Sequence, residues 1–308
     1  METILVTGGS GLVGKAIQEL SHHYPYQFIF ISSSEYDLSI EHQVNDLFTK
    51  VNPDYVIHLA AYVGGLYKNM NQPVNMIEKN LKMNLYMVEA CHRFKVKKLI
   101  ACLSTCIFPD QTTYPINETM LHHGPPHDSN ASYAYAKRML DIHCQAYRSQ
   151  YNSPFVCVIP TNIYGKHDNF SLEDGHVIPS LIHQCYLAKQ SGKPFIVRGT
   201  GTPLRQFILS TDLATILVQL ILHHDTPSRV IVSTNEEVTI RHVAECIAES
   251  FNYVDHIVFD SSYSDGQFKK TADATVLETL LKPQWTELQV GIKHTVEWFI
   301  EHYDITRK

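Results

Sequence analysis

The chain has 308 residues, of which 44% are hydrophobic and 18% charged, and its formal net charge at pH 7 is −6. This length suffices for one large two-lobed domain or two medium ones, and the composition is that of an ordinary globular protein. It excludes a disordered chain, a collagen-like repeat and a small disulfide-stapled protein. The mild negative charge argues against a protein that binds nucleic acid or an anionic membrane surface.

The sequence carries no signal for a membrane span or for secretion. The longest apolar stretch, Leu213–Leu222, is interrupted by Thr215 and Gln219, whereas a membrane span needs about 20 apolar residues. The first residues have no basic region and no cleavage site. The seven cysteines form no Cys-x-x-Cys pair, so we interpret them as reduced thiols. We therefore expect a cytoplasmic protein with no membrane partner, no nucleic-acid partner and no metal site.

Short apolar runs alternate with helical patterns through the first half of the chain. The runs are continuous rather than alternating, which predicts strands buried on both faces, as in a parallel sheet. The regular alternation of strand and helix predicts an α/β fold with a doubly wound sheet. The expected strands are Ile4–Val6, Phe28–Ile31, Tyr55–Leu59, Lys98–Leu103 and Phe155–Ile159, and the expected helices are Leu12–Ser21, Ile40–Lys50, Val74–Phe94 and Tyr133–Ser149.

The pattern becomes less regular beyond Gly165. We interpret the chain as a larger domain of residues 1–164 plus about 205–234, which contains the sheet, and a smaller, mostly α-helical substrate-binding lobe of about 165–204 plus 235–308. The long loop from Tyr114 to Ala131 is a candidate functional segment. The expected elements of the second half are helices at Val177–Ser191, Thr211–His223, Ile240–Phe251 and Leu288–Tyr303, and strands at Phe195–Val197 and Phe207–Leu209.

A glycine-rich segment directly follows the first expected strand and opens the first expected helix. It fits two registers, Gly9-x-Gly11-x-x-Gly14 and the wider Thr7-Gly8-x-x-Gly11-x-x-Gly14. Such glycines let the backbone turn sharply and approach a pyrophosphate at the positive end of the helix. A tight structural turn is the alternative, but the strand–turn–helix context favours a Rossmann-type dinucleotide site. The expected contacts are Gly8, Gly9, Ser10, Gly11, Leu12, Val13 and Gly14.

The end of the second strand bears on the choice of dinucleotide. An NAD-binding enzyme usually carries an acidic residue there for the ribose 2′-hydroxyl. This chain has Ser32 and Ser33 instead, which would not repel a 2′-phosphate, so we predict NADP(H). No arginine stands nearby to bind that phosphate, and Glu35 is expected to face solvent. Asp37 and Leu38 are candidates for contacts with adenine.

Tyr133 and Lys137 are four residues apart, so they share one face of the expected helix. A lysine ammonium there would lower the pKa of the phenol and let it exchange protons nearer neutral pH. This spacing arises by chance about once in a chain of this composition. The evidence for a catalytic pair is therefore its place in the fold and not the spacing itself. The pair opens the helix after the fourth strand, which runs into Ser104. The carboxyl ends of parallel strands face the cofactor cleft, where Ser104 could bind the oxygen that Tyr133 protonates.

Taken together, these features resemble the extended short-chain dehydrogenase/reductase family and, within it, the GDP-L-fucose synthases. Those enzymes epimerise GDP-4-keto-6-deoxy-D-mannose at C3 and C5 and reduce it at C4 with NADPH. Cys106 together with the His176 segment is specific to this branch. The matching segments span nearly the whole chain: Val6–Lys15, His58–Ala61 with Val63–Gly65, Cys102–Pro109, Pro160–Gly165 with His167–Phe170, Gly175–Pro179 and Ser264–Lys270.

The resemblance implies a role for each matching residue. Cys106 would be the base and His176 the acid of the epimerisation, and Tyr133 the acid of the reduction, with Lys137 also holding the nicotinamide ribose. Family members carry Trp where Arg198 stands and Lys or Arg where Gln184 stands. The resemblance also implies a homodimer formed by the helices Val74–Phe94 and Tyr133–Ser149. Further implied contacts are Ala60, Pro160, Thr161, Asn162, Ile163 and His176 with the cofactor, and Asn162, Gln184, Arg198, Arg205 and Asp265 with the substrate.

The residues also support this chemistry without the family resemblance, although they leave other roles and other enzyme classes open. A 4-keto sugar has acidic C–H bonds on both sides of its ketone, so one site could invert C3 and C5 and then accept a hydride at C4. By themselves, however, Cys106 is more often a small buried apolar residue and His176 a capping or surface histidine. A 4-epimerase, a 4-reductase, a 4,6-dehydratase or a non-catalytic NADP-binding regulator would share the fold. Cys106 and Ile107 follow Thr105, where a dehydratase would want two carboxylates.

Overall fold

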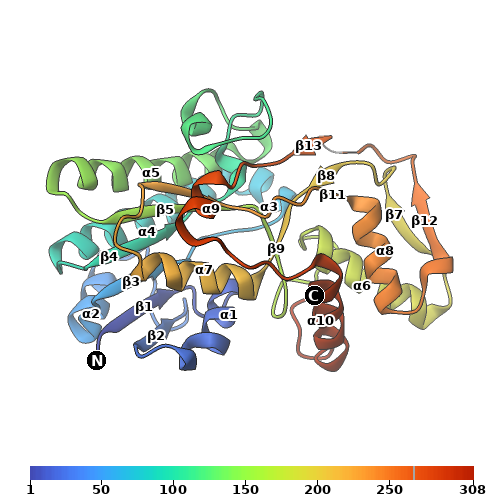
Figure 1. Cartoon of the computed structure of the whole chain (residues 1–308), viewed down its shortest axis with the longest axis horizontal. Coiled ribbons are helices and arrows are strands. Elements are labelled where there is room, and N and C mark those ends of the chain that lie inside the picture. The colour runs from blue at the N-terminus through green and yellow to red at the C-terminus, as the bar shows by residue number, and fades with distance from the viewer. Residues whose placement is uncertain (266–267) are drawn as a thin grey trace.

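The computed structural model describes residues 1–265 and 268–308, and Figure 1 shows two lobes side by side. Gly266 and Gln267, which belong to the matching segment Ser264–Lys270, lie outside the described residues. The larger lobe is built on a six-stranded parallel sheet with the strand order β10-β5-β4-β3-β1-β2. Its strands are β1 (Thr3–Thr7), β2 (Gln27–Ile31), β3 (Tyr55–His58), β4 (Lys98–Cys102), β5 (Phe155–Pro160) and β10 (Arg229–Val232).

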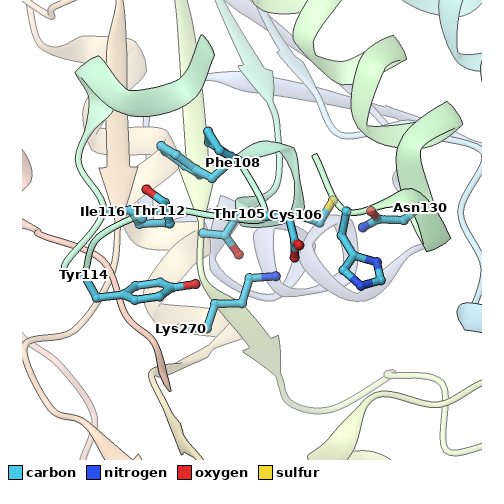
Figure 2. Close-up of a pocket in the computed structure, with 11 residues that line it drawn as sticks. Thr105, Cys106, Phe108, Thr112, Tyr114, Ile116, Asn130 and Lys270 are labelled. Atoms are coloured by element: carbon cyan, nitrogen blue, oxygen red, sulfur yellow. The ribbon is translucent and has the colours of Figure 1, made fainter. Parts of the chain in front are cut away.

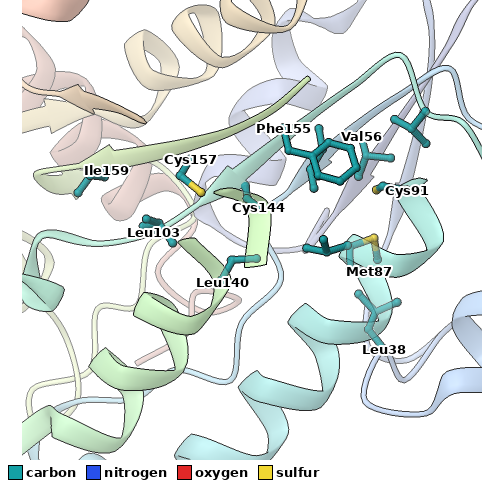
Figure 3. Packing of buried hydrophobic residues seen from close by; sticks show 14 of the residues in the cluster. Leu38, Val56, Met87, Cys91, Leu103, Leu140, Cys144, Phe155, Cys157 and Ile159 are labelled. Atoms are coloured by element: carbon teal, nitrogen blue, oxygen red, sulfur yellow. The ribbon is translucent and has the colours of Figure 1, made fainter. Parts of the chain in front are cut away.

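Helices cover both faces of this sheet. Leu5 of β1 packs into the core on one face, while its neighbours Ile4 and Val6 pack into the core on the other. This burial on both sides explains the continuous apolar runs and confirms the predicted doubly wound fold. Figure 3 shows the first of these cores. It lies under α2 (Glu41–Val51), α4 (Pro73–Arg93) and α5 (Ala131–Tyr151), and the second lies under α1 (Leu12–Leu20) and α7 (Ser210–Leu222).

The strand order determines where a ligand cleft can form. After β1 the chain first adds β2 on one side of it and then returns to add β3 on the other side. Ligands of such sheets bind beyond the carboxyl ends of the strands, at the point where the order reverses. The glycine-rich turn after β1 and Ala60 after β3 both lie at that point.

The smaller lobe has its own apolar core. Phe207–Leu209, predicted as a strand, forms β9 and pairs with β6 (Asn162–Tyr164) rather than with the central sheet. Within the described residues, no helix is long and apolar enough to cross a membrane. The elements of this lobe are α6 (Val177–Ser191), α8 (Ile240–Ser250), α10 (Leu288–Glu301), β7 (Phe195–Arg198), β8 (Leu204–Arg205), β11 (Val238–Thr239), β12 (Ile257–Asp260) and β13 (Lys269–Lys270).

Two helices and several short strands were not predicted from the sequence. The helices are α3 (Leu66–Asn71) and α9 (Thr275–Leu281), and the sixth strand of the large sheet, β10, was also missed. Each of these elements is too short to show a clear helical or strand period. Most predicted boundaries hold within about two residues. Three helices end at residues that tolerate the left-handed conformation: Asn52 after α2, Asn152 after α5 and Gly192 after α6.

Candidate functional site

The glycine-rich turn is held between β1, β2 and β3. Gly8 has a φ of +71°, which favours glycine, and a side chain there would press on the backbone of Ala60. Gly14 lies so close to the carbonyl of Gly8 that a side chain would collide with it. The Gly9 N–H donates to the carbonyl oxygen of Ile31 at 2.8 Å, which fixes the turn to the end of β2. The turn thus keeps the start of α1 against the sheet.

The start of α1 offers unpaired donors. Gly11 precedes the helix, and among the described residues no side chain caps its first turn. The N–H groups of Leu12, Val13 and Gly14 therefore point out of the helix with its positive end. Ser10 beside them is exposed. This arrangement fits the pyrophosphate of a dinucleotide.

The end of β2 differs from the expectation in one respect. Glu35 is exposed, as predicted, but its carboxylate turns back and accepts hydrogen bonds from the N–H and the hydroxyl of Ser32, both at 2.8 Å. The interpretation that no carboxylate lies here was therefore wrong. Ser33 is exposed beside them, and the Asp37 carboxylate accepts from Ser39. The side chain of Leu38 is only 5% exposed and packs in the core. A contact between Leu38 and adenine would therefore be made by its backbone.

A buried polar chain supports Ala60 at the end of β3. The hydroxyl of Thr7 bonds His58 Nδ1 at 2.8 Å and accepts the Ala60 N–H at 3.2 Å. His58 Nε2 in turn bonds Asn84 of α4 at 3.1 Å. The sequence indicated Thr7 only as the first residue of the wider glycine register and gave no role to Asn84, although both are buried polar residues. The chain fixes the backbone beside the glycine turn.

Lys137 and Tyr133 lie at the carboxyl end of β4. Lys137 is 2% exposed, and its ammonium donates to the carbonyl oxygen of Cys102 at 2.7 Å. The same nitrogen lies 6.0 Å from the centre of the Tyr133 ring. The expected lowering of the Tyr133 pKa is not found, because burial raises that pKa well above its ordinary value. Burial also lowers the pKa of Lys137. Tyr133 is thus a protonated phenol over the neutral range, suited to donate.

Ser104 and Cys106 form a tight turn directly after β4. The Cys106 N–H donates to the Ser104 hydroxyl at 3.4 Å, at the start of a short 3₁₀ turn, Thr105–Ile107. Cys106 is partly buried beside Tyr133, whose pKa its thiolate would raise further. Ser104, Cys106, Tyr133 and Lys137 therefore gather at the end of one strand, as predicted.

Cys106 also lines a pocket, shown in Figure 2, into which Lys270 and Tyr114 point. Lys270 lies 164 positions further along the chain and comes from β13. Burial raises the pKa of Cys106, whereas the Ser104 hydrogen bond and the charges of Lys270 and Lys137 lower it. Lys270 is the positive neighbour that a thiolate base requires. The pocket is lined by Thr105, Cys106, Phe108, Pro109, Asp110, Thr112, Tyr114, Ile116, His127, Asn130 and Lys270.

Lys270 was not predicted as a site residue. Its only signal was membership of the segment Ser264–Lys270, because its position in the pocket of Cys106 depends on how β13 packs. Tyr114, His127 and Asn130 come from the loop Tyr114–Ala131, which the sequence did mark as a functional candidate. The loop therefore forms one wall of the pocket.

His176 stands directly before α6, at the start of the smaller lobe. Its side chain is exposed, and it has no hydrogen-bond partner within the described ranges. Desolvation by the surrounding protein lowers the pKa of His176, so the neutral imidazole predominates at neutral pH. The structure places it on the opposite lobe from Cys106 and shows no contact between the two among the described residues.

The segment after β5 connects the two lobes. Pro160 and Thr161 are buried, and the Thr161 N–H donates to Val232 of β10. Asn162 is exposed, and its side-chain amide donates to the Gln206 carbonyl at 2.8 Å. Ile163 is partly buried in the core under α7. Within the described part of the chain, no hydrogen bond occupies the amide oxygen of Asn162, so it can face a ligand.

The predicted substrate residues fall into two groups. Arg205 is the register partner of Lys270 in the β8–β13 pair. Burial lowers the pKa of Lys270, and the charge of Arg205 lowers it further. The others lie elsewhere in the smaller lobe. Gln184 of α6 donates to Ser180, Arg198 lies 4.9 Å from the centre of the Tyr263 ring, and Asp265 accepts from the N–H and hydroxyl of Thr200.

Comparison with known proteins agrees with this arrangement. The NAD dependent epimerase/dehydratase family model matches residues 4–233. The GDP-L-fucose synthase of Dictyostelium discoideum is 47% identical and aligns over 99% of this chain and 98% of that protein. A probable GDP-L-fucose synthase of Drosophila melanogaster is 43% identical over the whole of both chains. The crystal structure of a GDP-L-fucose synthetase from Naegleria fowleri bound to NADP has a TM-score of 0.96 and 44% identity, covering 100% of this chain and 95% of that one.

Proposed function

Because the chain belongs to the NAD dependent epimerase/dehydratase family, we propose that it catalyses the GDP-L-fucose synthase reaction, with NADPH as the reductant. In this reaction GDP-4-keto-6-deoxy-D-mannose is epimerised at C3 and C5 and then reduced at C4. The observation that carries the proposal is the cluster of Ser104, Cys106, Tyr133 and Lys137 at the carboxyl edge of the sheet, the edge where the glycine turn also lies. The unpaired N–H groups at the start of α1 fit the pyrophosphate of the cofactor.

The epimerisation uses the acidity of the two C–H bonds next to the ketone. Tyr133 and Ser104 donate hydrogen bonds to the C4 oxygen and stabilise the negative charge that forms there. Cys106, as thiolate, removes the proton from C3 or C5 on one face of the ring. His176 brings a proton to the opposite face when the lobes close on the substrate. Each inversion converts Cys106 from thiolate to thiol and His176 from imidazolium to neutral imidazole. It therefore starts from the less populated ionic state of each residue, and both return to that state by proton exchange with water.

The reduction then uses the same ketone. NADPH, when bound, would supply the hydride for C4, and Tyr133 gives its phenolic proton to the C4 oxygen. Lys137, held by the Cys102 carbonyl, stands behind Tyr133 and stabilises the phenolate left after proton transfer. Arg205 and Lys270 provide positive charge at the pocket for the diphosphate. We assign Asn162, Gln184, Arg198 and Asp265 to the remaining parts of the nucleotide sugar.

Activity is expected with GDP-4-keto-6-deoxy-D-mannose and NADPH. Absorbance at 340 nm should fall only when both are present, and NMR of the product formed in deuterated water should show deuterium at C3 and C5. Deuterium at both carbons together with reduction at C4 separates this function from a 4-epimerase, a 4,6-dehydratase or a simple 4-reductase. An unchanged absorbance with this substrate would refute the proposal.

We also propose that the chain forms a homodimer through α4 and α5. The two helices pack side by side on one face of the sheet, as Figure 1 shows. Three large apolar residues on α5, Tyr135, Met139 and Ile142, follow each other at helical spacing, and each is more than 40% exposed. Leu85 of the adjacent helix α4 is also exposed. A second copy of the chain would bury these residues in a four-helix bundle.

Replacing Ile142 with glutamate should convert the dimer to a monomer, since a charge would be buried at the centre of the interface. Light scattering after size-exclusion chromatography measures the mass directly. Ile300 of α10 is 46% exposed, as Ile142 is, so Ile300→Glu is a matched control that should remain dimeric. A wild-type protein that elutes as a monomer at all concentrations would rule out the proposed dimer.

We place the protein in the cytoplasm. All seven cysteines of the sequence fall within the described residues, and each is a free thiol. Free thiols in this number are typical of a reducing compartment, which supports the location.

A further inference from the structure

A site that uses a nicotinamide dinucleotide, as proposed above, can distinguish NADP(H) from NAD(H), and the proposal below rests on that function. The two cofactors differ only in a phosphate on the 2′-oxygen of the adenosine ribose. In Rossmann-type folds this ribose lies at the end of the second strand, beside the glycine turn. Here the hydrogen bond from Gly9 to Ile31 joins the turn to the end of β2, so residues 32–35 are the ones that meet the 2′-position.

These residues already hold an anion of the protein itself. The Glu35 carboxylate accepts hydrogen bonds from the N–H and the hydroxyl of Ser32, both at 2.8 Å. The hydroxyl of Ser34 lies 2.8 Å from that of Ser32 and completes a small group of donors. A backbone N–H and two serine hydroxyls are the kind of donors that a phosphate takes at such a site. The carboxylate therefore occupies the position that a 2′-phosphate would need.

Little positive charge opposes this carboxylate. The first arginine of the whole sequence is Arg93, which bonds Asn45 on α2. Lys50 of α2 exerts a small attraction on Glu35, and Lys15 of α1 is hydrogen-bonded to Gln18. The hydrogen bonds from Ser32 lower the pKa of Glu35, so the carboxylate stays charged at neutral pH. A phosphate that entered here would meet a like charge with no adjacent guanidinium to offset it.

We propose that Glu35 is the residue that sets cofactor selectivity, because its carboxylate occupies the 2′-phosphate site and must leave Ser32 before NADP(H) can bind fully. With NAD(H) the carboxylate can stay and accept a hydrogen bond from the free 2′-hydroxyl. With NADP(H) it must swing into solvent, which its exposed position allows. The serines thus permit NADP(H), while Glu35 reduces its advantage over NAD(H).

Equilibrium binding tests this directly, without turnover. Isothermal titration with 2′,5′-ADP and 5′-AMP, and fluorescence titration with NADPH and NADH, would be carried out on the wild type, Glu35→Ala and Glu35→Gln. We expect Glu35→Ala to bind 2′,5′-ADP and NADPH roughly tenfold more tightly, a factor that corresponds to about 1.4 kcal/mol. Glu35→Gln keeps the size and removes the charge, so it should show a smaller gain. Binding of NADH should stay the same or weaken in both.

The control is Glu41→Gln at the start of α2, which removes one exposed negative charge from the same region without touching Ser32. Its NADPH-to-NADH affinity ratio should change less than twofold. An unchanged or lower NADPH-to-NADH ratio in both Glu35 variants would overturn the inference, as would an equal gain in Glu41→Gln. Failure of the wild type to bind either dinucleotide would instead refute the proposed function.

Discussion

Replacing Tyr133 with phenylalanine is expected to slow the reduction at C4 by roughly three orders of magnitude, the loss typical of a missing general acid. The ring is retained, so the packing around Lys137 and Cys102 should persist. Only the phenolic O–H is lost, and with it the proton for the C4 oxygen. Stopped-flow measurement of NADPH oxidation at 340 nm gives the rate.

Exchange at C3 and C5 should persist in part in the same variant. Ser104 still donates to the C4 oxygen, so the enolate keeps one of its two hydrogen bonds. Tyr147→Phe, the same change near the C-terminal end of α5, is the matched control and should keep the wild-type rate. Normal reduction by Tyr133→Phe would mean that the Tyr133–Lys137 spacing is a chance occurrence.

The direction of the Tyr133 pKa adds a pH test. Burial raises this pKa, so the phenol remains protonated and competent as an acid from acidic to moderately alkaline pH. Reduction should therefore show no loss between about pH 6 and pH 9 that arises from ionisation of Tyr133. A phenol whose pKa were lowered by Lys137 would instead lose its proton within this range, and the rate would decline.

Replacing Cys106 with serine should abolish hydrogen exchange at C3 and C5 while leaving NADPH affinity unchanged. A serine hydroxyl has the size of the thiol but does not ionise at accessible pH, so it cannot serve as the base. NMR of the substrate incubated in deuterated water with an unreactive oxidised cofactor reports the exchange, and fluorescence titration reports NADPH binding. Cys246→Ser on α8 is a control outside the proposed site, expected to exchange normally.

The pH dependence of exchange in the wild type follows from the Cys106 environment. Burial raises the pKa of Cys106 more than Ser104, Lys270 and Lys137 lower it, so the thiol is mostly protonated at neutral pH. The fraction of thiolate increases as the pH rises, so exchange in which Cys106 itself returns the proton should accelerate from pH 7 to pH 9. Inversion, which also needs a protonated His176, should not accelerate over this range. Undiminished exchange in Cys106→Ser, with the same pH profile as the wild type, would assign the base to another residue.

The sequence by itself determined the architecture of the larger lobe. The continuous apolar runs of β1 to β5 and the helical patterns between them are local signals, because each residue's burial follows from its position in one strand or helix. The glycine turn after β1 is local too, since its spacing reflects the geometry of one strand, one turn and one helix. The position of Ser104, Cys106 and Tyr133 follows from the same logic, because the carboxyl ends of parallel strands share one edge.

Only the tertiary structure decided which distant groups meet these residues. Lys270 reaches Cys106 from β13, and Glu35 turns back onto Ser32 rather than extending into solvent. The Tyr133 pKa is raised rather than lowered because the whole fold buries the phenol, whereas the sequence shows only its neighbour Lys137. Periodicity records which face of an element is apolar, but it does not record how loops and short strands pack over that face. Charge, solvation and hydrogen-bond partners at the site are set by that packing, so the sequence could name candidate residues while the fold determined their electrostatic surroundings.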